Sequence, residues 1–217
     1  MSELLSALPL LLQGAALSFA VASSSFLLGC TGGIFLGCAN SDYLRTPLWG
    51  RLIDLFVLCA RGTPLTIQVL IAFFFVPDLL SFSWSPVTAG ICTLGINSMA
   101  YVAEIVRGGF NGIPMGQWEV SHTMGYSQWA TLVQIIFPQL FRSIFPALVG
   151  EYINLIKESG ILLIIGVQEL SKISKEAVAR DLNFSIYLLA ALLYFCMTGS
   201  ITYLGKRWEQ RRKIWST

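Results

Sequence analysis

The chain has 217 residues, of which 55% are apolar and 12% are charged, and its formal net charge is +2. Soluble domains carry about 25% charged residues, so this composition excludes an ordinary soluble enzyme, and the small net charge gives no support to nucleic-acid binding. The mean hydropathy of +0.68 therefore predicts a membrane protein with room for several spans of about 20 residues each.

Five apolar stretches predict five transmembrane helices, over about residues 4–39, 52–76, 86–106, 141–166 and 184–204. The first stretch precedes every Lys and Arg and is too long for a signal peptide, so we expect a retained helix, which a short interfacial piece around Pro9 could precede. Small residues recur every four positions in it, at Ser25, Gly29, Gly33 and Gly37. This stripe indicates either close approach of another helix or generic packing.

The second stretch is interrupted by Arg61-Gly-Thr-Pro64. Pro64 removes an intrahelical hydrogen bond, so we expect the helix to break or kink there. The fold class is thus all-α: a polytopic membrane protein, with residues 1–217 forming a single transmembrane domain.

The distribution of Lys and Arg predicts the orientation of the chain in the membrane. Five positive residues crowd the C-terminal end: Lys206, Arg207, Arg211, Arg212 and Lys213. Others flank the connections between the first and second stretches and between the third and fourth. With five spans, the N-terminus is expected outside and the C-terminus in the cytoplasm, and the long amphipathic connection after the third span faces the cytoplasm.

The sequence shows no reaction chemistry of its own. His122 is the one histidine, the cysteines form no Cys-x-x-Cys pair, and there is no P-loop. We therefore expect no catalytic residue, no metal and no cofactor.

The long connection contains Glu119-Val-Ser121, then Gly125, Ile135 and Pro138. This spacing resembles the Glu-Ala-Ala signature of type I ABC importer permeases, in which a Gly and then an Ile-x-Leu-Pro segment follow the acidic residue. Three further segments are similar to the polar amino-acid branch of that family, whose members import histidine, arginine, glutamine or cystine. They are Arg61-Gly-Thr-Pro-Leu65 with Gln68, Ala103-Glu-Ile-Val-Arg-Gly-Gly109, and Ile165-Gly-Val-Gln-Glu-Leu170.

The resemblance implies a set of partners in a bacterial inner membrane. Two permease subunits, as a homodimer or a heterodimer, would form the pathway in the lipid bilayer. A cytoplasmic ABC ATPase would bind a short coupling helix of each permease, and an extracytoplasmic binding protein would deliver the amino acid. ATP hydrolysis would take place in the separate ATPase, so the chain itself would not be an enzyme.

The coupling residues implied by the resemblance are Glu119, Gly125, Trp118, Met124 and Pro138. Gly125 would offer its backbone for close approach to the ATPase groove. Glu119, expected early in the helix, would complement the helix dipole, and Trp118 and Met124 would be apolar anchors. An interfacial helix lying on lipid is the alternative interpretation of this stretch.

Charged residues within the spans must be paired or face water, because an unpaired charge in hydrocarbon is costly. Arg61 is expected either to pair with Glu104 or to form part of a cytoplasmic gate. Glu151 and Glu158 are two helical turns apart and share one face of the fourth span. We expect Glu158 first, and Glu151 second, to contact the substrate's ammonium.

Asn154 adds a polar group to the same span, and Lys157 points to one side. A Glu–Lys pair within a subunit interface is the alternative to a substrate site on this span. For the whole chain, a self-contained secondary transporter or a membrane scaffold that recruits a cytoplasmic protein are the alternatives to an importer permease.

Overall fold

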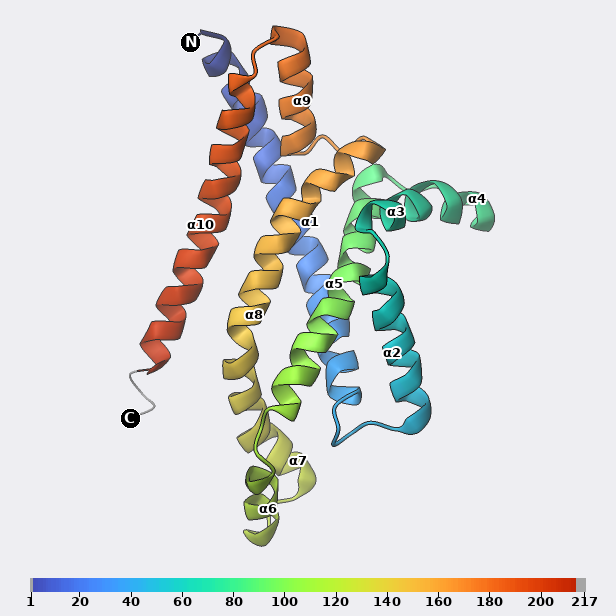
Figure 1. Ribbon diagram of the computed structural model, residues 1–217, viewed down its shortest axis with the longest axis vertical. Helices are drawn as coiled ribbons and strands as arrows, with labels where there is room; N and C mark the ends of the chain where they lie inside the picture. Colours follow the sequence, from blue (N-terminus) through green and yellow to red (C-terminus); the bar gives the residue numbers. More distant parts are fainter. Residues whose placement is uncertain (1, 214–217) are drawn as a thin grey trace.

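The computed structural model describes residues 2–213, which form helices joined by turns and loops with no strand in that range. Four long helices run along the bundle (Figure 1): α1 (Ser2–Ala39), α5 (Pro86–Asn111), α8 (Phe137–Glu158) and α10 (Ser185–Lys213). The shorter helices are α2 (Pro47–Gly62), α3 (Leu65–Leu70), α4 (Val76–Leu80), α6 (Met115–Thr123), α7 (Gln128–Ala130) and α9 (Leu170–Asp181). Two π-helices, η1 (Ile71–Phe75) and η2 (Thr131–Ile136), and a 3-10 helix, η3 (Ser159–Ile165), complete the described chain.

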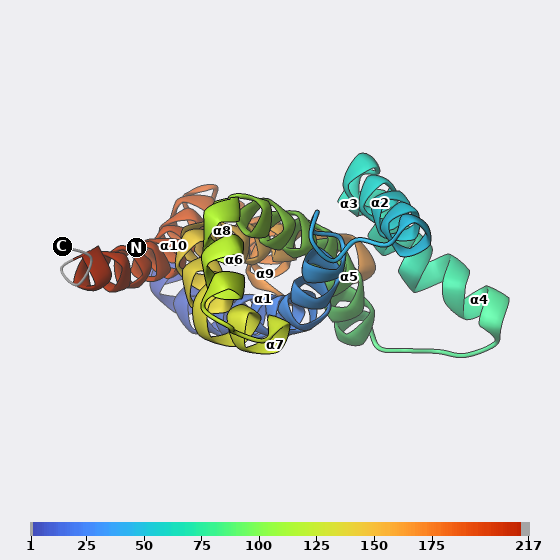
Figure 2. The same cartoon turned by 90° about the horizontal axis from the view of Figure 1, so that it is seen from below.

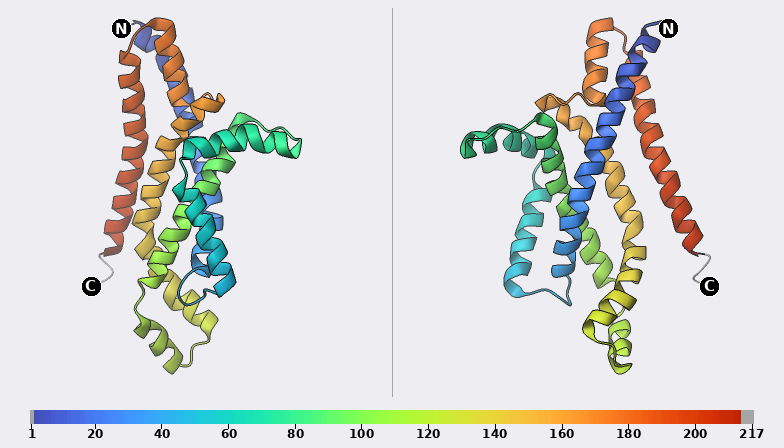
Figure 3. Two further views of the ribbon diagram at one scale, coloured as in Figure 1. Left: turned by 45° about the vertical axis from the view of Figure 1, so that its right-hand side comes forward. Right: turned by 180° about the vertical axis from the view of Figure 1, so that it is seen from behind.

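By length and composition, four helical segments can cross a membrane: Ala7–Ala39, Pro86–Asn111, Gln128–Ile165 and Ser185–Arg211. Together, Pro47–Gly62 and Leu65–Leu80 are long and apolar enough for a fifth, broken span, and they are bent by 101° at the break between them. The bend turns α3 and α4 sideways, so that they project from the bundle (Figures 1 and 3). The break at Pro64 is confirmed, and the helices agree with four spans, or with the predicted five where the bent pair counts as one span.

Two details of the spans differ from the sequence prediction. No separate interfacial piece precedes the first span, because α1 runs without interruption through Pro9. The fourth span begins at Gln128 rather than near Phe141, because η2 carries α7 directly into α8 without a loop.

The small-residue stripe of α1 packs against α5 of the same chain. A Cβ placed on Gly37 would lie 2.5 Å from the carbonyl oxygen of Ala103, and one on Gly33 would lie 2.6 Å from Cβ of Val102. Both distances are shorter than real Cβ contacts, so the two helices are in contact only because these positions lack side chains. The stripe is therefore an internal packing surface, which places α5 at the centre of the bundle.

The break between α2 and α3 exposes backbone carbonyls that two amide side chains satisfy. Gln68 Nε2 donates to the carbonyls of Ala60 and Thr63 at 2.8 and 3.1 Å. Asn97 Nδ2, from α5, donates to the same Ala60 carbonyl at 2.8 Å and to Oε1 of Gln68 at 3.1 Å. These bonds supply the partners that the end of a helix inside a membrane needs.

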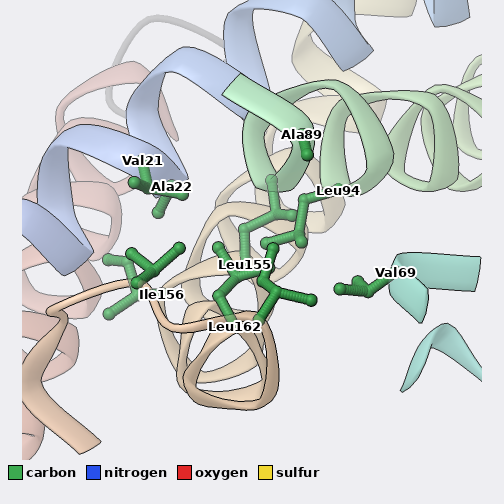
Figure 4. Close-up of a cluster of buried hydrophobic side chains, with 10 residues drawn as sticks. Val21, Ala22, Val69, Ala89, Leu94, Leu155, Ile156 and Leu162 are labelled. Atoms are coloured by element: carbon green, nitrogen blue, oxygen red, sulfur yellow. The ribbon is translucent and has the colours of Figure 1, made fainter. Parts of the chain in front are cut away.

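The core beside this break joins helices that are distant in sequence (Figure 4). Its central residues are Val21, Ala22, Val69, Ala89, Leu94, Leu155, Ile156 and Leu162, all at most 1% exposed. They come from α1, α3, α5, α8 and η3, so the broken span is anchored to the three central helices.

At one end of the bundle, α9 is attached through the buried carboxylate of Glu169. That carboxylate accepts hydrogen bonds from the backbone N–H groups of Ser171 and Lys172 at 2.8 and 2.7 Å, and from the hydroxyl of Tyr194 on α10 at 3.0 Å. Burial raises the pKa of Glu169, while these hydrogen bonds lower it. The carboxylate thus caps α9 and fixes it against α10.

Candidate functional site

The segment α6–α7 extends beyond the ends of the long helices (Figures 1 and 3), and α6 lies in front of the bundle when the molecule is seen from below (Figure 2). It exposes large apolar side chains, namely Met115 (56%), Val120 (56%), Met124 (69%) and Trp129 (71%). Exposed apolar clusters of this kind mark surfaces that bind a protein or a membrane.

A sharp turn at Gly125 ends α6. Gly125 has a φ of +79°, its N–H donates to the carbonyl of His122 at 3.0 Å, and the N–H of Tyr126 donates to that of Ser121 at 3.0 Å. This pair of bonds is the Schellman arrangement, in which the left-handed position favours glycine. A Cβ on Gly125 would meet nothing within 4 Å in this chain. Within the chain, the requirement for glycine is therefore conformational.

Trp118 is not the exposed anchor that the sequence indicated. Its ring stacks on Tyr43, with centroids 4.6 Å apart, and lies 5.8 Å from the ring of Phe110. Tyr43 belongs to the loop after α1, and Phe110 to the end of α5. Trp118 is thus half-buried, and its ring contacts hold α6 against the bundle. Trp118 is therefore a positioning residue for the exposed apolar surface of α6.

The other predicted residues of this segment lie on its surface. Glu119 is exposed in the middle of the nine-residue helix α6 rather than in its first turn, so the helix dipole gives it little stabilisation. It forms no ion pair or hydrogen bond with another residue in the described part of the chain. Pro138 is exposed in the first turn of α8, directly after the π-helix η2.

Of the two alternatives for Arg61, the contact with Glu104 is present in the structure. Nη1 of Arg61 lies 3.5 Å from Oε2 of Glu104. Arg107 binds the same carboxylate through two hydrogen bonds, of 2.9 and 3.0 Å. These three side chains line a cleft of about 520 Å³ between α2 and α5.

The two carboxylates of α8 have different surroundings in the structure. Glu151 is 7% exposed and accepts a 2.7 Å hydrogen bond from the hydroxyl of Ser98 on α5, so it joins two helices. Glu158, the last residue of α8, is half-buried and forms neither an ion pair nor a hydrogen bond with any described residue. Within the described chain Lys157 and Glu158 form no ion pair, and a Glu–Lys pair across a subunit interface stays a prediction; Asn154 and Lys157 are both exposed.

Sequence reasoning missed Tyr43, Ser98 and Tyr101, which support Trp118, Glu151 and Arg61. Ser98 and Tyr101 lie within an apolar stretch, where a small polar or aromatic residue gives no signal to separate it from a packing or lipid-facing residue. Tyr43 gives a weak signal, because it is the one aromatic residue of the loop between α1 and α2.

A broken span and charged residues inside the bundle are typical of membrane transport proteins, and the exposed apolar surface at one end fits a permease that binds a partner. Residues 29–214 match the family described as "Binding-protein-dependent transport system inner membrane component". The chain belongs to this family, and it is therefore an inner-membrane component of a transport system. This membership favours the importer permease over the secondary transporter and the scaffold.

Curated relatives match almost the whole chain. The arginine transport system permease protein ArtQ of Bacillus subtilis is 33% identical over 207 residues, covering 95% of this chain and 94% of that protein. The glutamine transport system permease protein GlnP of Escherichia coli K12 is 31% identical over 212 residues, covering 96% and 95%.

Solved structures share the fold. A chain of "an amino acid ABC transporter with histidines" has a TM-score of 0.87 at 28% identity, covering 95% of this chain and 96% of that one. A chain of the MetNI methionine ABC transporter, in an inward facing conformation, has a TM-score of 0.82 at 20% identity, covering 94% and 96%. The second likeness establishes the fold alone.

Proposed function

We propose that the chain is the permease subunit of an ATP-driven importer for a polar amino acid. The observation that carries the proposal is the apolar surface of α6, held out from the bundle by Trp118 and ended by the turn at Gly125. The names of the arginine and glutamine permeases among its relatives support the substrate class. The chain acts as one transmembrane domain over residues 1–217, and ATP is hydrolysed by separate ABC ATPase subunits.

The coupling step uses the α6 surface. Val120 and Met124 enter a groove of the ATPase as apolar side chains, and Glu119 is free to bind a basic group there because it has no partner in the described chain. A movement of the ATPase is transmitted to the spans through the stacked rings of Trp118 and Tyr43 and through Pro138 at the start of α8.

The pathway is completed by a second permease subunit, identical or a sister chain, and an external binding protein delivers the amino acid. Glu158 binds the substrate's ammonium, since its carboxylate lacks a partner in the described chain. Asn154 lies one turn earlier on the same helix and is exposed. Glu151 supports this site from the contact with α5, and Arg61 lines the cytoplasmic half of the pathway.

The orientation of the chain in the membrane is inferred from the positions of Lys and Arg at the two ends of the bundle. The start of α1 and α9 lie at one end, and α6, the loop after α1 and the end of α10 lie at the other (Figure 1). Arg45, Arg51, Lys206 and Arg207 are exposed near the second end, while the side chains of Arg212 and Lys213 lie outside the described part of the chain. The positive-inside rule puts this second end in the cytoplasm and the N-terminus outside.

The test is copurification followed by transport. The chain is expected to copurify with an ABC ATPase and, in vesicles supplied with the binding protein, to take up radiolabelled arginine or glutamine only when ATP is present. Uptake without an ATPase, driven by an ion gradient alone, would contradict the proposal.

A further inference from the structure

A charged cleft lies between α2 and α5, on the side of the bundle where the broken span turns away. Its volume is about 520 Å³, and it is lined by Asp54, Val57, Leu58, Arg61, Gly62, Tyr101, Glu104 and Arg107. Both helices belong to membrane spans. Charged groups at such positions must be paired or face water, and the side chains of Arg61 and Asp54 are 41% and 50% exposed, which favours a cleft on the aqueous pathway over one on lipid.

The two carboxylates of the cleft are already neutralised. Asp54 accepts hydrogen bonds from Arg45 at 2.5 Å and from Asn40 at 2.8 Å. Glu104 accepts two hydrogen bonds from Arg107, at 2.9 and 3.0 Å, one on each oxygen. A two-point guanidinium–carboxylate pair of this kind is the strongest geometry available to Glu104.

Arg61 is bound to a carboxylate more weakly than Arg45 and Arg107 are. It approaches Glu104 at 3.5 Å through one nitrogen only, without a hydrogen bond. The cleft is lined by two guanidinium groups, those of Arg61 and Arg107, and by two carboxylates, of which Asp54 is bound by Arg45 from outside the lining. Among the described lining residues, Arg61 is therefore the guanidinium that no carboxylate binds through a hydrogen bond.

The side chain of Arg61 is nevertheless held in a defined position. Its Cζ lies 4.9 Å from the centroid of the Tyr101 ring, a cation–π contact. At 41% exposure it is more accessible than the side chains of Arg107 (35%) and Glu104 (28%). Its N–H donors are therefore fixed in direction and open to the cleft, as the recognition of a planar anion requires.

We infer that the charged cleft is a second binding station of the pathway, on the cytoplasmic side of Glu158, where Arg61 binds the α-carboxylate of the amino acid. Tyr101 positions the guanidinium, and Arg107 is a positioning residue that occupies Glu104 and so keeps Arg61 available. The inference rests on the proposed function, because it takes its ligand from the transported substrate.

The role of Arg107 gives a distinctive experiment. Arg107→Gln leaves Glu104 without its strong partner, so Glu104 captures Arg61 and the station is lost. Adding Glu104→Gln removes the carboxylate that would bind Arg61, so Arg61 is again available to the substrate. We therefore expect Arg107→Gln to lower the initial rate of uptake about tenfold, and the double variant to restore it to within about twofold of the parent.

Two further variants test the binding group and its support. Arg61→Gln is expected to lower uptake by about ten- to a hundredfold, the range for one charge-assisted hydrogen bond. Tyr101→Phe keeps the aromatic face and is expected to transport normally, whereas Tyr101→Leu loses it and is expected to resemble Arg107→Gln.

The measurement is ATP-dependent uptake of radiolabelled arginine and glutamine into proteoliposomes holding the complete complex and the binding protein, with copurified ATPase as the check on assembly. If the double variant is as impaired as Arg107→Gln while both assemble, the Glu104–Arg107 pair is structural and the inference is overturned. If the variants differ only in liposomes that contain anionic lipid, the cleft binds a phospholipid headgroup, which also overturns it. If the parent complex takes up no amino acid, the proposed function fails instead.

Discussion

Glu158 combines three properties of a ligand-binding carboxylate: it ends a membrane helix, it is half-buried, and it has no partner in the described chain. If it binds the substrate's ammonium, Glu158→Gln removes the charge and keeps the shape. A charge-assisted hydrogen bond is worth roughly 1.5–3 kcal/mol, so the affinity at the membrane site should fall about ten- to a hundredfold. The measurement is uptake as a function of substrate concentration.

The matched control for Glu158 is its exposed neighbour, Lys157→Gln, which removes a charge of the opposite sign from the same turn. We expect it to keep uptake within about twofold of the parent. An equal loss in both variants would indicate a Glu–Lys pair formed with the second subunit, and it would remove Glu158 from the substrate site.

Gly125 could be required for its left-handed backbone or for close approach to the ATPase, and the two reasons make different predictions. Asn tolerates a positive φ but adds a side chain, whereas Ala at this φ costs roughly 1–2 kcal/mol. If the turn is what matters, Gly125→Asn keeps ATPase copurification, Gly125→Ala weakens it, and Gly125→Arg abolishes transport-linked ATP hydrolysis.

The measurement for the Gly125 series is the amount of ATPase retained on the purified permease at equal expression. Should Asn abolish binding as completely as Arg, close approach is the requirement, and the argument from the turn geometry is wrong.

At the scale of the elements, the break in the second span depends on side chains outside it. Asn97 donates hydrogen bonds to Gln68 and to the carbonyl of Ala60, which Gln68 also binds, so Asn97→Leu leaves this carbonyl with one partner fewer. The cost of losing such a bond is roughly 1–3 kcal/mol. We expect the thermal unfolding temperature of the solubilised protein to fall by several degrees, measured by size-exclusion chromatography after heating.

Thr93 provides the control for Asn97, because it lies one turn away on α5, is also buried, and donates only to Ala89 of its own helix at 2.8 Å. Thr93→Val should change the unfolding temperature much less. Equal effects of the two variants would mean that packing on α5, rather than support of the break, sets the stability.

The elements could be predicted from the sequence where hydropathy or proline determines them. The apolar helices and the break at Pro64 are of this kind. For Arg61 the sequence leaves two alternatives, pairing with Glu104 or a place in the gate, because a charge within a span can either pair or face water. The early start of the fourth span at Gln128 could not be predicted, since Gln128 and Gln134 weaken the apolar signal of α7 and η2.

The sites were predicted less completely, because they depend on contacts between distant segments. The stacking of Trp118 on Tyr43 and the bond from Ser98 to Glu151 join residues more than fifty positions apart. Hydropathy and helical spacing carry no information about such pairs. Hydropathy did identify Glu158, because a charged residue inside an apolar stretch stands out in the sequence whatever its contacts in the fold are.

At the scale of the whole molecule, the two ends of the bundle differ in charge and shape, and this asymmetry predicts how the chain crosses the membrane. The loop containing Ser83 follows α4 on the side from which the broken span projects, and Ser127 lies beside α7 at the opposite end (Figure 1). Both residues are exposed. With Cys30, Cys38, Cys59, Cys92 and Cys196 replaced, single cysteines at these two positions report their side of the membrane independently.

We expect Ser83→Cys to react with a membrane-impermeant thiol reagent added to intact cells, and Ser127→Cys to react only after the membrane is opened. The physical reason is the cost of moving the exposed Lys and Arg residues near α6 across the bilayer against the positive-inside bias. Labelling of both after permeabilisation is the control for accessibility. The reverse pattern in intact cells would place α6 outside, where no ATPase could bind it, and would contradict both the orientation and the coupling role of α6.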